Sequence, residues 1–392
     1  MKFTRIGAVS TAGAVACIVA VGGSAPAFGG TARHEALPPA AASCTNAAGA
    51  KAAIAKVWKQ SEQILGVPQL APPNKTYCYV NTSKYKKSGP YTIAFASQGP
   101  TNSWASSSDA YVRYVANQNH VKLLYASANG DATKQVSNVQ DLLAQRPDAL
   151  LIQPMSNAVQ ALLHRAAQSN IPVVVCTGEL PNTNDIVSTV NRDYTLNGTL
   201  FAQAIVKYLH GKGEVAMISG IPGVPTAELQ YQAAKAFFAK YPGIKIVTHQ
   251  YDNWSPTQAK TVAASIVAKY PNVKAVWSDS SFTDVGVAQA WTAAHKPIPF
   301  VTGDSSNGFL RVAKQYRVKF ALSAYPPEQC GQAIKVVTQI LQAKPVLNQV
   351  PPQSAVYTNK QLSKYYRPQC TDNLWVPSSL PAAILKQLKL CK

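Results

Sequence analysis

The chain has 392 residues, of which 47% are hydrophobic and 14% are charged. This balance provides a large hydrophobic core and excludes an intrinsically disordered chain, and the length allows two or three domains. The formal net charge of +20 admits a nucleic-acid partner, but the basic residues are spread along the sequence and gather only at residues 84–87, in a predicted linker. We therefore interpret the charge as that of an exported protein that works against an anionic cell envelope, and we expect no nucleic-acid partner.

Residues 1–27 have the pattern of a secretory signal peptide. Its basic start, apolar stretch and small-x-small cleavage site are Lys2 and Arg5, residues 6–21, and Ala25-Pro26-Ala27. We expect cleavage after Ala27 and export to the periplasm or to the outer face of the cell membrane or wall. An alternative is a lipid anchor at Cys17, although the residues before it make a poor lipobox. No other segment is long and apolar enough to span a bilayer.

Six of the seven cysteines remain if Cys17 leaves with the signal peptide. An even number of cysteines in an exported chain is consistent with disulfides. Cys44 and Cys78 bracket an N-terminal extension, and Cys370 and Cys391 bracket a C-terminal one. We therefore predict these two pairs.

The two other cysteines, Cys176 at the end of an apolar run and Cys330 in a predicted helix, have the character of small core residues. No spacing of Cys and His residues indicates a metal site, and we expect no cofactor.

Residues 28–90 form an N-terminal extension and linker. Its parts are an Ala/Pro-rich stretch to Ser43 without expected structure, a helix over Ala47–Leu65, a linker over Pro68–Asn74 and a short strand at 77–80.

From Tyr91 onward, apolar runs alternate with helical patterns in two successive sets. The first set has strands near 91–96, 121–126, 149–152 and 172–176, with helices near 106–118, 132–145 and 157–168. The second has strands near 214–219, 244–250, 273–277, 298–302 and 319–323, with helices near 194–210, 226–240, 256–269, 283–294, 306–316 and 328–342. A short strand near 354–357 and helices from Asn359 and Leu380 follow. This alternation predicts an α/β fold of parallel sheets with helices on both faces, in two lobes that meet across a cleft.

The residues that follow the predicted strands are polar and aromatic. Ligands of open α/β sheets bind at these strand ends. The set is Gln98–Trp104, Asn129, Asp131, Gln153–Asn157, Thr177–Glu179, Gly220–Thr226, Glu228, Asp252–Ser255, Asp279–Ser281, Asp304–Asn307 and Tyr325. Rings that stack on an apolar face, beside amides, hydroxyls and carboxylates, suit a sugar or a cyclic polyol.

Several of these residues also have an ordinary structural explanation. Trp104 can pack at a helix start, and Trp254 can cover the next helix, because Ser255-Pro256 is a helix-start pattern. Asp279, Ser280 and Asp304 can act as caps or turn residues, and Thr177–Glu179 gives the weakest signal. The sequence has no motif of a hydrolase, zinc protease, phosphate-binding loop or dinucleotide site, so we expect no enzyme.

Residues 91 to about 360 resemble the type I periplasmic binding proteins of the ribose and simple-sugar class, the solute receptors of ABC importers. The matching segments are Tyr91–Phe95, Asn102–Trp104, Gln135–Leu143, Pro147–Pro154, Asn170–Val175, Lys240–Gly243, Pro271–Trp277 and Val301–Asp304. The resemblance implies two doubly wound lobes joined by a three-strand hinge that close on a small-molecule ligand, and a monomer that docks on a membrane permease. Repressors of the same family carry an N-terminal helix-turn-helix, whereas a signal segment stands here, which argues against DNA.

The domains expected on this resemblance are residues 91–191 with about 326–350 for lobe 1, residues 192–325 with about 351–360 for lobe 2, and a C-terminal extension over 361–392.

The resemblance also implies roles for individual residues. Asn102 falls at a polar contact of the family, and Trp104 and Trp254 fall at its two stacking aromatics. Three more ligand positions carry over: the Asp after a Gly, a position that usually holds Asn, and a hinge position that often holds Gln. They are Asp304, Ser280 and Tyr325.

Two positions depart from the family. Its Asp-Arg pair after the fourth strand is Thr177-Gly178 here, and its Arg near residue 226 has become Gln230, or Glu228 in a shifted register. The loss of both Arg donors removes bidentate contacts to ring hydroxyls. We therefore do not expect ribose, but a less polar, modified or aromatic ligand, or a cationic one bound by Glu179, Glu228 and Asp304.

We accordingly expect an exported solute-binding protein that captures a sugar, polyol or related compound between its lobes and delivers it to an ABC importer. The alternatives are a ligand-sensing component of a signalling system and an enzyme on the same fold.

Overall fold

The computed structural model describes residues 44–66, 68–70, 75–351 and 354–392. The expected signal peptide, the alternative lipid site at Cys17 and the Ala/Pro-rich stretch to Ser43 lie outside the described residues, as does most of the expected linker at 68–74.

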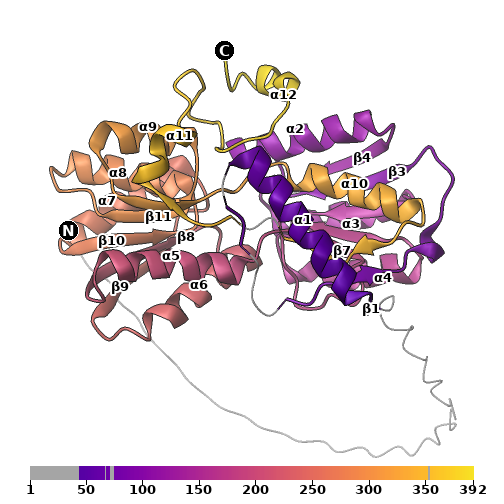
Figure 1. Ribbon diagram of the computed structural model, residues 1–392, viewed down its shortest axis with the longest axis horizontal. Helices are drawn as coiled ribbons and strands as arrows, with labels where there is room; N and C mark the ends of the chain where they lie inside the picture. Colours follow the sequence, from indigo (N-terminus) through magenta and orange to yellow (C-terminus); the bar gives the residue numbers. More distant parts are fainter. Residues whose placement is uncertain (1–43, 67, 71–74, 352–353) are drawn as a thin grey trace, which may run out of the picture. The chain divides into compact units, whose positions relative to one another are not determined.

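Two six-stranded sheets form the framework (Figure 1). The first has the order β14-β7-β6-β5-β3-β4, and all its neighbours are parallel. Its strands are β3 (Thr92–Ser97), β4 (Lys122–Ser127), β5 (Ala149–Ile152), β6 (Val173–Cys176), β7 (Ser188–Val190) and β14 (Gln349–Val350).

The second sheet has the order β15-β12-β11-β10-β8-β9 and is parallel except at its β15 edge. Its strands are β8 (Gly213–Ser219), β9 (Ile244–Tyr251), β10 (Val273–Ser278), β11 (Phe300–Asp304), β12 (Phe320–Ser323) and β15 (Tyr357–Thr358).

Helices cover both faces of each sheet. The first sheet carries α2 (Ser103–Gln118), α3 (Ala132–Ala144), α4 (Gln160–Gln168) and α10 (Gln329–Leu341), and we call this unit lobe 1. The second carries α5 (Tyr194–Tyr208), α6 (Pro225–Phe238), α7 (Pro256–Lys269), α8 (Ser281–Ala293) and α9 (Asn307–Tyr316), and we call it lobe 2.

Alternate strand residues explain why both faces are covered. In β5, Leu150 and Ile152 pack toward α3 and α4, whereas Leu151 packs toward α2 and α10. In β10, Trp277 packs toward α5 and Val276 toward the opposite layer. Strands that are buried on both faces read as continuous apolar runs, which is the pattern of the sequence.

The chain passes between the lobes three times: after β7, after β12, and between β14 and β15. The predicted α/β fold with two doubly wound lobes and a three-strand hinge is therefore confirmed. In each sheet the strand order reverses next to the first strand, between β3 and β5 and between β8 and β10. Such switch points are where ligands bind in this kind of sheet.

The start of α2 differs from the prediction. Its N-cap is Asn102, whose side chain accepts a hydrogen bond from Ala105 N at 3.0 Å, rather than a residue from 106–109. Trp104 therefore lies in the first helical turn and not in a loop. Asn and Ser are both good caps, so the sequence offered several starts. The prediction also missed the short strand β7.

Three disulfides are present among the described residues. The predicted pairs Cys44–Cys78 and Cys370–Cys391 are confirmed. Cys176 and Cys330 are buried core residues, as interpreted, but the sequence analysis missed that they form the third disulfide, with their Cα atoms 5.1 Å apart. This bond ties the end of β6 to the start of α10, next to the second passage between the lobes.

The N-terminal extension contributes α1 (Ala47–Leu65), as predicted, and β1 (Cys44–Thr45) and β2 (Tyr79–Val80). These strands form a small sheet of order β1-β2-β13 with β13 (Val346–Leu347). Trp58 on α1 donates its indole N–H to the carbonyl of Pro351, at 2.8 Å. The extension therefore holds the chain where it makes its third passage.

The C-terminal extension carries α11 (Leu362–Tyr365) and α12 (Ala382–Gln387). The short 3-10 turns of the structure are η1 (Ser83–Tyr85), η2 (Asn157–Val159) and η3 (Asn359–Gln361).

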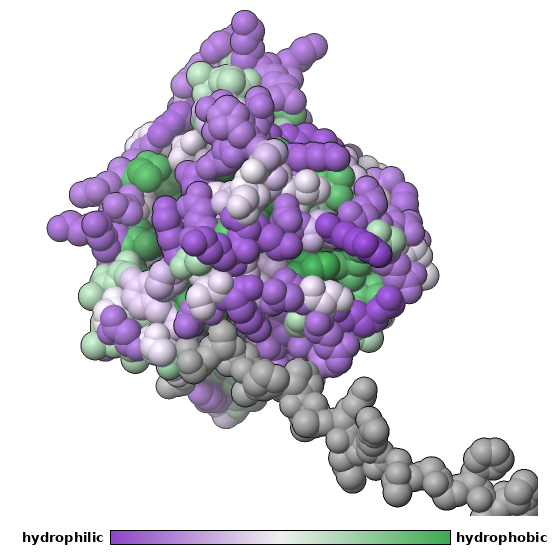
Figure 2. Space-filling view, turned by 90° about the vertical axis from the view of Figure 1, so that its right-hand side faces the viewer, coloured by the Kyte–Doolittle hydropathy of each residue, from purple (hydrophilic) through white to green (hydrophobic). Residues whose placement is uncertain are grey.

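The outer face of lobe 1 is mainly hydrophilic (Figure 2). Hydrophobic residues appear on it in small separate groups, as is usual for a protein surface. Within the described ranges, no helix combines the length and the hydrophobicity needed to cross a bilayer.

Candidate functional site

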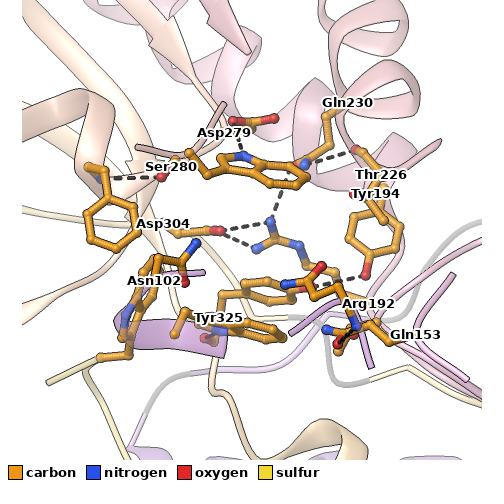
Figure 3. Close-up of a pocket in the computed structure, with 16 residues that line it drawn as sticks. Asn102, Gln153, Arg192, Tyr194, Thr226, Gln230, Asp279, Ser280, Asp304 and Tyr325 are labelled. Atoms are coloured by element: carbon orange, nitrogen blue, oxygen red, sulfur yellow. Dashed lines mark hydrogen bonds and ion pairs between the residues drawn. The ribbon is translucent and has the colours of Figure 1, made fainter. Parts of the chain in front are cut away.

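A pocket lies at the strand ends of both lobes (Figure 3). Its lining residues are Gln98, Asn102, Trp104, Gln153, Thr177, Arg192, Tyr194, Thr226, Gln230, Trp254, Asp279, Ser280, Phe282, Asp304, Tyr325 and Trp375.

Most of the predicted site residues meet in this pocket. They are Asn102, Trp104, Thr177, Gln230, Trp254, Ser280, Asp304 and Tyr325. Asn102 and Ser280 are also the N-caps of α2 and α8. Each of these two residues therefore caps a helix and lines the pocket at the same time.

Glu179 and Glu228 do not line the pocket. The carboxylate of Glu179 lies 3.3 Å from Lys75 Nζ, and that of Glu228 accepts a hydrogen bond from Tyr251 Oη at 3.0 Å. Both residues were predicted from their positions after strands. Their carboxylates turn instead to Lys75 and Tyr251, away from the pocket. The cationic ligand that we considered therefore loses two of its three carboxylates.

Trp254 has an unusual backbone. It lies between β9 and α7 with φ of 50°, in the left-handed region that a bulky residue seldom adopts. Thr177, another pocket residue, has φ of 47°. Such conformations persist only where the surroundings enforce them, and they concentrate at functional sites.

The indole of Trp254 lies across the backbone of Gly220, at the end of β8. A Cβ atom at Gly220 would stand 1.9 Å from the indole Cε2, so only glycine allows this approach. The indole N–H donates to Asp279 Oδ1 at 3.0 Å. The ring is thus fixed in position before any ligand arrives.

Asp279 is a buried acid with few compensating charges. Burial, and then the negative charge of Asp252, raise the pKa of its carboxyl to about 8. Burial likewise raises the pKa of Asp252 to about 6. The Asp279 carboxyl is therefore largely protonated at neutral pH.

The opposite wall of the pocket is a stacked aromatic pair. The rings of Trp104 and Tyr325 lie 4.9 Å apart and are tilted by 8°. The Trp104 indole N–H donates to the Tyr325 carbonyl at 2.8 Å. Because Tyr325 belongs to the second passage between the lobes, this stack links lobe 1 to the hinge.

Arg192 was missed by the sequence analysis. It lies in the first passage between the lobes, and its guanidinium makes a bidentate ion pair with Asp304, with N–O distances of 2.5 and 3.0 Å (Figure 3). It also donates to Gln230 Oε1 at 3.2 Å and lies 3.8 Å above the centre of the Tyr325 ring.

The cleft therefore contains a guanidinium, although the two positions at which the family carries Arg hold Gly178 and Gln230 here. Arg192 is 2% exposed; burial lowers the pKa of its guanidinium, but the charge of Asp304, the hydrogen bonds to it and the two nearby tyrosines together raise the pKa overall. Burial raises the pKa of the Asp304 carboxyl, and the guanidinium opposes that rise. We treat the two as a charged pair, since bidentate pairs of this kind are strong.

Three other lining residues were not among the predicted strand-end residues: Tyr194, Phe282 and Trp375. Arg192 follows β7, the strand that the sequence analysis missed, and Tyr194 begins α5, within the helix predicted at 194–210. Trp375 comes from the C-terminal extension, where no sequence pattern pointed to the site. Over the described part of the chain, no cluster of His, Cys, Asp and Glu side chains could hold a metal ion.

Comparison with known proteins decides the family. The profile of the family described as "Periplasmic binding protein domain" matches residues 93–345. The chain belongs to this family. Its two parallel-sheet lobes and its sugar-binding relatives confirm the predicted type I, simple-sugar class.

The relatives are binding proteins of sugar and polyol systems. The ribose import binding protein of Bacillus subtilis is 26% identical over 301 residues, 76% of this chain and 95% of the relative. The D-apiose import binding protein of Actinobacillus succinogenes is 25% identical and the match covers 48% of this chain and 61% of the relative. The xylitol-binding protein of Mycolicibacterium smegmatis is 25% identical, over 51% of this chain and 58% of the relative. This binding protein thus spans about three fifths of the length of the last two.

Solved structures share the fold. The binding component of the arabinose ABC transporter from Shewanella sp. ANA-3 has a TM-score of 0.64 and 20% identity, covering 70% of this chain and 93% of the other. A galactofuranose binding protein has a TM-score of 0.65 and 19% identity, covering 70% and 97%.

The buried carboxyl of Asp279 predicts a pH dependence of stability. Its pKa in the folded protein lies above that of an unfolded Asp, so its stabilising contribution is complete below about pH 4 and is lost as the pH rises through 8. From pH 5 to 8, the free energy of unfolding of the Asp279→Asn variant should rise by about 2–4 kcal/mol relative to wild type. Urea unfolding at several pH values measures this, and parallel pH profiles for the two proteins would contradict it.

The Arg192–Asp304 pair predicts a pattern of non-additive stabilities. Arg192→Met should lower the free energy of unfolding by about 3–5 kcal/mol, because it leaves a buried carboxylate unpaired. The double variant Arg192→Met/Asp304→Asn should recover much of that loss, since it buries no charge at this place. Chemical unfolding of wild type, both single variants and the double variant tests this. A double variant no more stable than Arg192→Met would refute it.

Proposed function

We propose that this chain is an exported solute-binding protein that captures a small polyhydroxylated molecule between its lobes and presents it to an ABC importer. The observation that carries the proposal is the pocket itself, where an indole from lobe 2 and a stacked aromatic pair from lobe 1 and the hinge line one cavity with buried polar groups. Only closure of the lobes lets a ligand contact both walls, so binding favours the closed form.

A sugar or cyclic polyol fits the chemistry of these walls. Its C–H faces can stack on Trp254 and on Trp104, while its hydroxyls meet carboxyl, amide and hydroxyl groups. Arg192 supports the same class, because it lines the pocket and its Nε–H has no hydrogen-bond partner among the described residues. A neutral ligand is favoured over a cationic one, since Asp304 is already paired with Arg192 and Asp279 is largely protonated.

The proposed role requires no chemical step by the chain, and the named relatives import or bind their solutes. The expected partner is a membrane permease, and the protein is expected to act as a monomer outside the cell membrane. Cleavage after Ala27 or lipid attachment at Cys17 would serve this location equally.

A ligand panel tests the proposal directly. Thermal unfolding of the mature chain is measured with pentoses, hexoses, acyclic and cyclic polyols, nucleosides and aromatic acids. At a concentration of 100 times Kd, a ligand adds about 2.7 kcal/mol to the free energy of unfolding, so at least one sugar or polyol should raise Tm by several degrees. Recovery of that compound unchanged supports a binding protein, whereas its conversion would contradict the proposal.

Trp254 should be a principal contact for the ligand. Trp254→Ala is expected to weaken binding of the best compound of the panel by about 1–3 kcal/mol, the scale of one large aromatic contact. Isothermal titration calorimetry measures this. Tyr316→Ala is the control, since it removes a ring of the same lobe that is 44% exposed and does not line the pocket. Equal affinities for the two variants would remove Trp254 from the site.

A further inference from the structure

One wall of the pocket comes from outside the matched family domain. The family match ends at residue 345, and among the lining residues only Trp375 lies beyond it. Trp375 is 4% exposed and packs with Trp104, Phe282 and Tyr325 in one aromatic cluster. Its ring meets that of Phe282 edge to face, with centroids 5.6 Å apart. The C-terminal extension thus places an indole beside Trp104 of lobe 1 and Phe282 of lobe 2.

The segment around Trp375 is bound to lobe 2 by backbone hydrogen bonds. Asn307 N donates to Leu374 O at 2.8 Å, and Val376 N donates to Ser305 O at 3.2 Å, so Trp375 forms an antiparallel bridge with Ser306. These bonds hold Trp375 at the end of β11, directly after Asp304.

Side chains and one glycine strengthen this attachment. The Asn307 amide donates to the carbonyls of Arg367, Cys370 and Thr371 at 2.9–3.1 Å. Gly308 N donates to Asp372 O at 3.1 Å, and a Cβ atom at Gly308 would stand 2.9 Å from the Asp372 Cβ atom. The start of α9 is therefore shaped to receive the C-terminal segment.

The same segment also reaches lobe 1. The Trp375 indole N–H donates to Ser103 Oγ, in the first turn of α2, at 3.1 Å. Ser379 N donates to Glu328 Oε1 at 2.7 Å, next to the start of α10, and α12 packs against α2. In Figure 1 the chain after α11 runs from the side of α9 toward α2. These lobe 1 contacts use side chains, whereas those with lobe 2 combine backbone–backbone bonds with side-chain bonds from Asn307 and Arg311.

A disulfide closes the segment into a loop. Cys370 and Cys391 are bonded, and Thr371 N donates to Leu390 O at 2.7 Å beside them. The two ends of residues 371–390 are thus joined to each other. We call residues 366–392 the strap.

We propose that the strap is part of the binding site: Trp375 contacts the ligand, and the strap fastens lobe 2 to lobe 1 over the pocket. This rests on the proposed function, because it concerns the same pocket. Ligand exchange requires the strap to release Ser103 and Glu328 on lobe 1 while it stays attached to lobe 2. The ligand that fits is a single-ring sugar or cyclitol, held among the indoles of Trp104, Trp254 and Trp375.

The first test needs no ligand. Trp375→Ala is compared with wild type and with Trp375→Phe, which keeps an aromatic ring, by small-angle scattering and amide hydrogen exchange of the mature chain. Trp375→Ala should increase the radius of gyration and speed exchange at Ser379, whereas the Tyr316→Ala control, which removes an exposed ring of lobe 2 outside the pocket, should leave both unchanged. If a folded Trp375→Ala variant keeps the radius of gyration and the exchange rate of the wild type, the strap does not fasten the two lobes to each other.

The second test uses the sugar or polyol that raises Tm most in the panel. Trp375→Ala should lower its affinity at least about tenfold, which corresponds to about 1.4 kcal/mol, and Trp375→Phe should restore most of it. Unchanged affinity in Trp375→Ala would overturn the ligand contact. If Trp375→Ala fails to fold, the Trp375→Phe and Trp375→Leu variants decide, with affinity expected to be lower in Trp375→Leu. If no compound of the panel raises the Tm of the wild type, the proposed function is wrong. The scattering and exchange measurements then test by themselves whether the strap fastens the lobes.

Discussion

The buried ion pair between Arg192 and Asp304 is the contact on which the site depends. It joins the first passage between the lobes to the end of β11, and the Arg192 guanidinium covers the ring of Tyr325 on the second passage. The pair also places the single positive charge among the lining residues beside buried acids that are otherwise poorly compensated. The Arg192 guanidinium therefore contacts two hinge segments and also lies at the polar centre of the pocket. A ligand that contacts this guanidinium acts on the hinge directly, without a relay of intermediate residues.

The sequence could predict much of the fold because its signals are local. Apolar runs and helix-start patterns fixed the order of strands and helices, and the rule that ligands bind at strand ends brought Trp254, Ser280 and Asp304 forward as candidates. What failed depends on contacts between distant residues. Arg192 follows β7, a strand that the sequence analysis missed, so the strand-end rule did not reach it, and the Cys176–Cys330 bond spans 154 residues. Glu179 and Glu228 were at the predicted places but turn to Lys75 and Tyr251. Trp375 lies in the C-terminal extension, beyond the alternating strands and helices, so the strand-end rule did not apply to it.

The two extensions act at different places on one hinged molecule. The N-terminal one binds the third passage between the lobes through Trp58 and Pro351, and the C-terminal one binds both lobes beside the pocket. A disulfide closes each extension, and a third joins β6 to α10. Covalent bonds of this kind suit a protein that works outside the reducing cytoplasm. They leave the packed lobes free of cross-links to each other, so closure remains possible.

The left-handed backbone at Trp254 has a consequence for anyone who redesigns this protein as a biosensor. A bulky residue in that region carries a conformational cost on the order of 1 kcal/mol, which glycine or asparagine would relieve. Replacement of Trp254 by either residue would thus ease the backbone while it removes a wall of the pocket. Selection of variants for heat resistance alone would therefore drift away from ligand recognition, and a library built on this scaffold needs a binding screen from its first round.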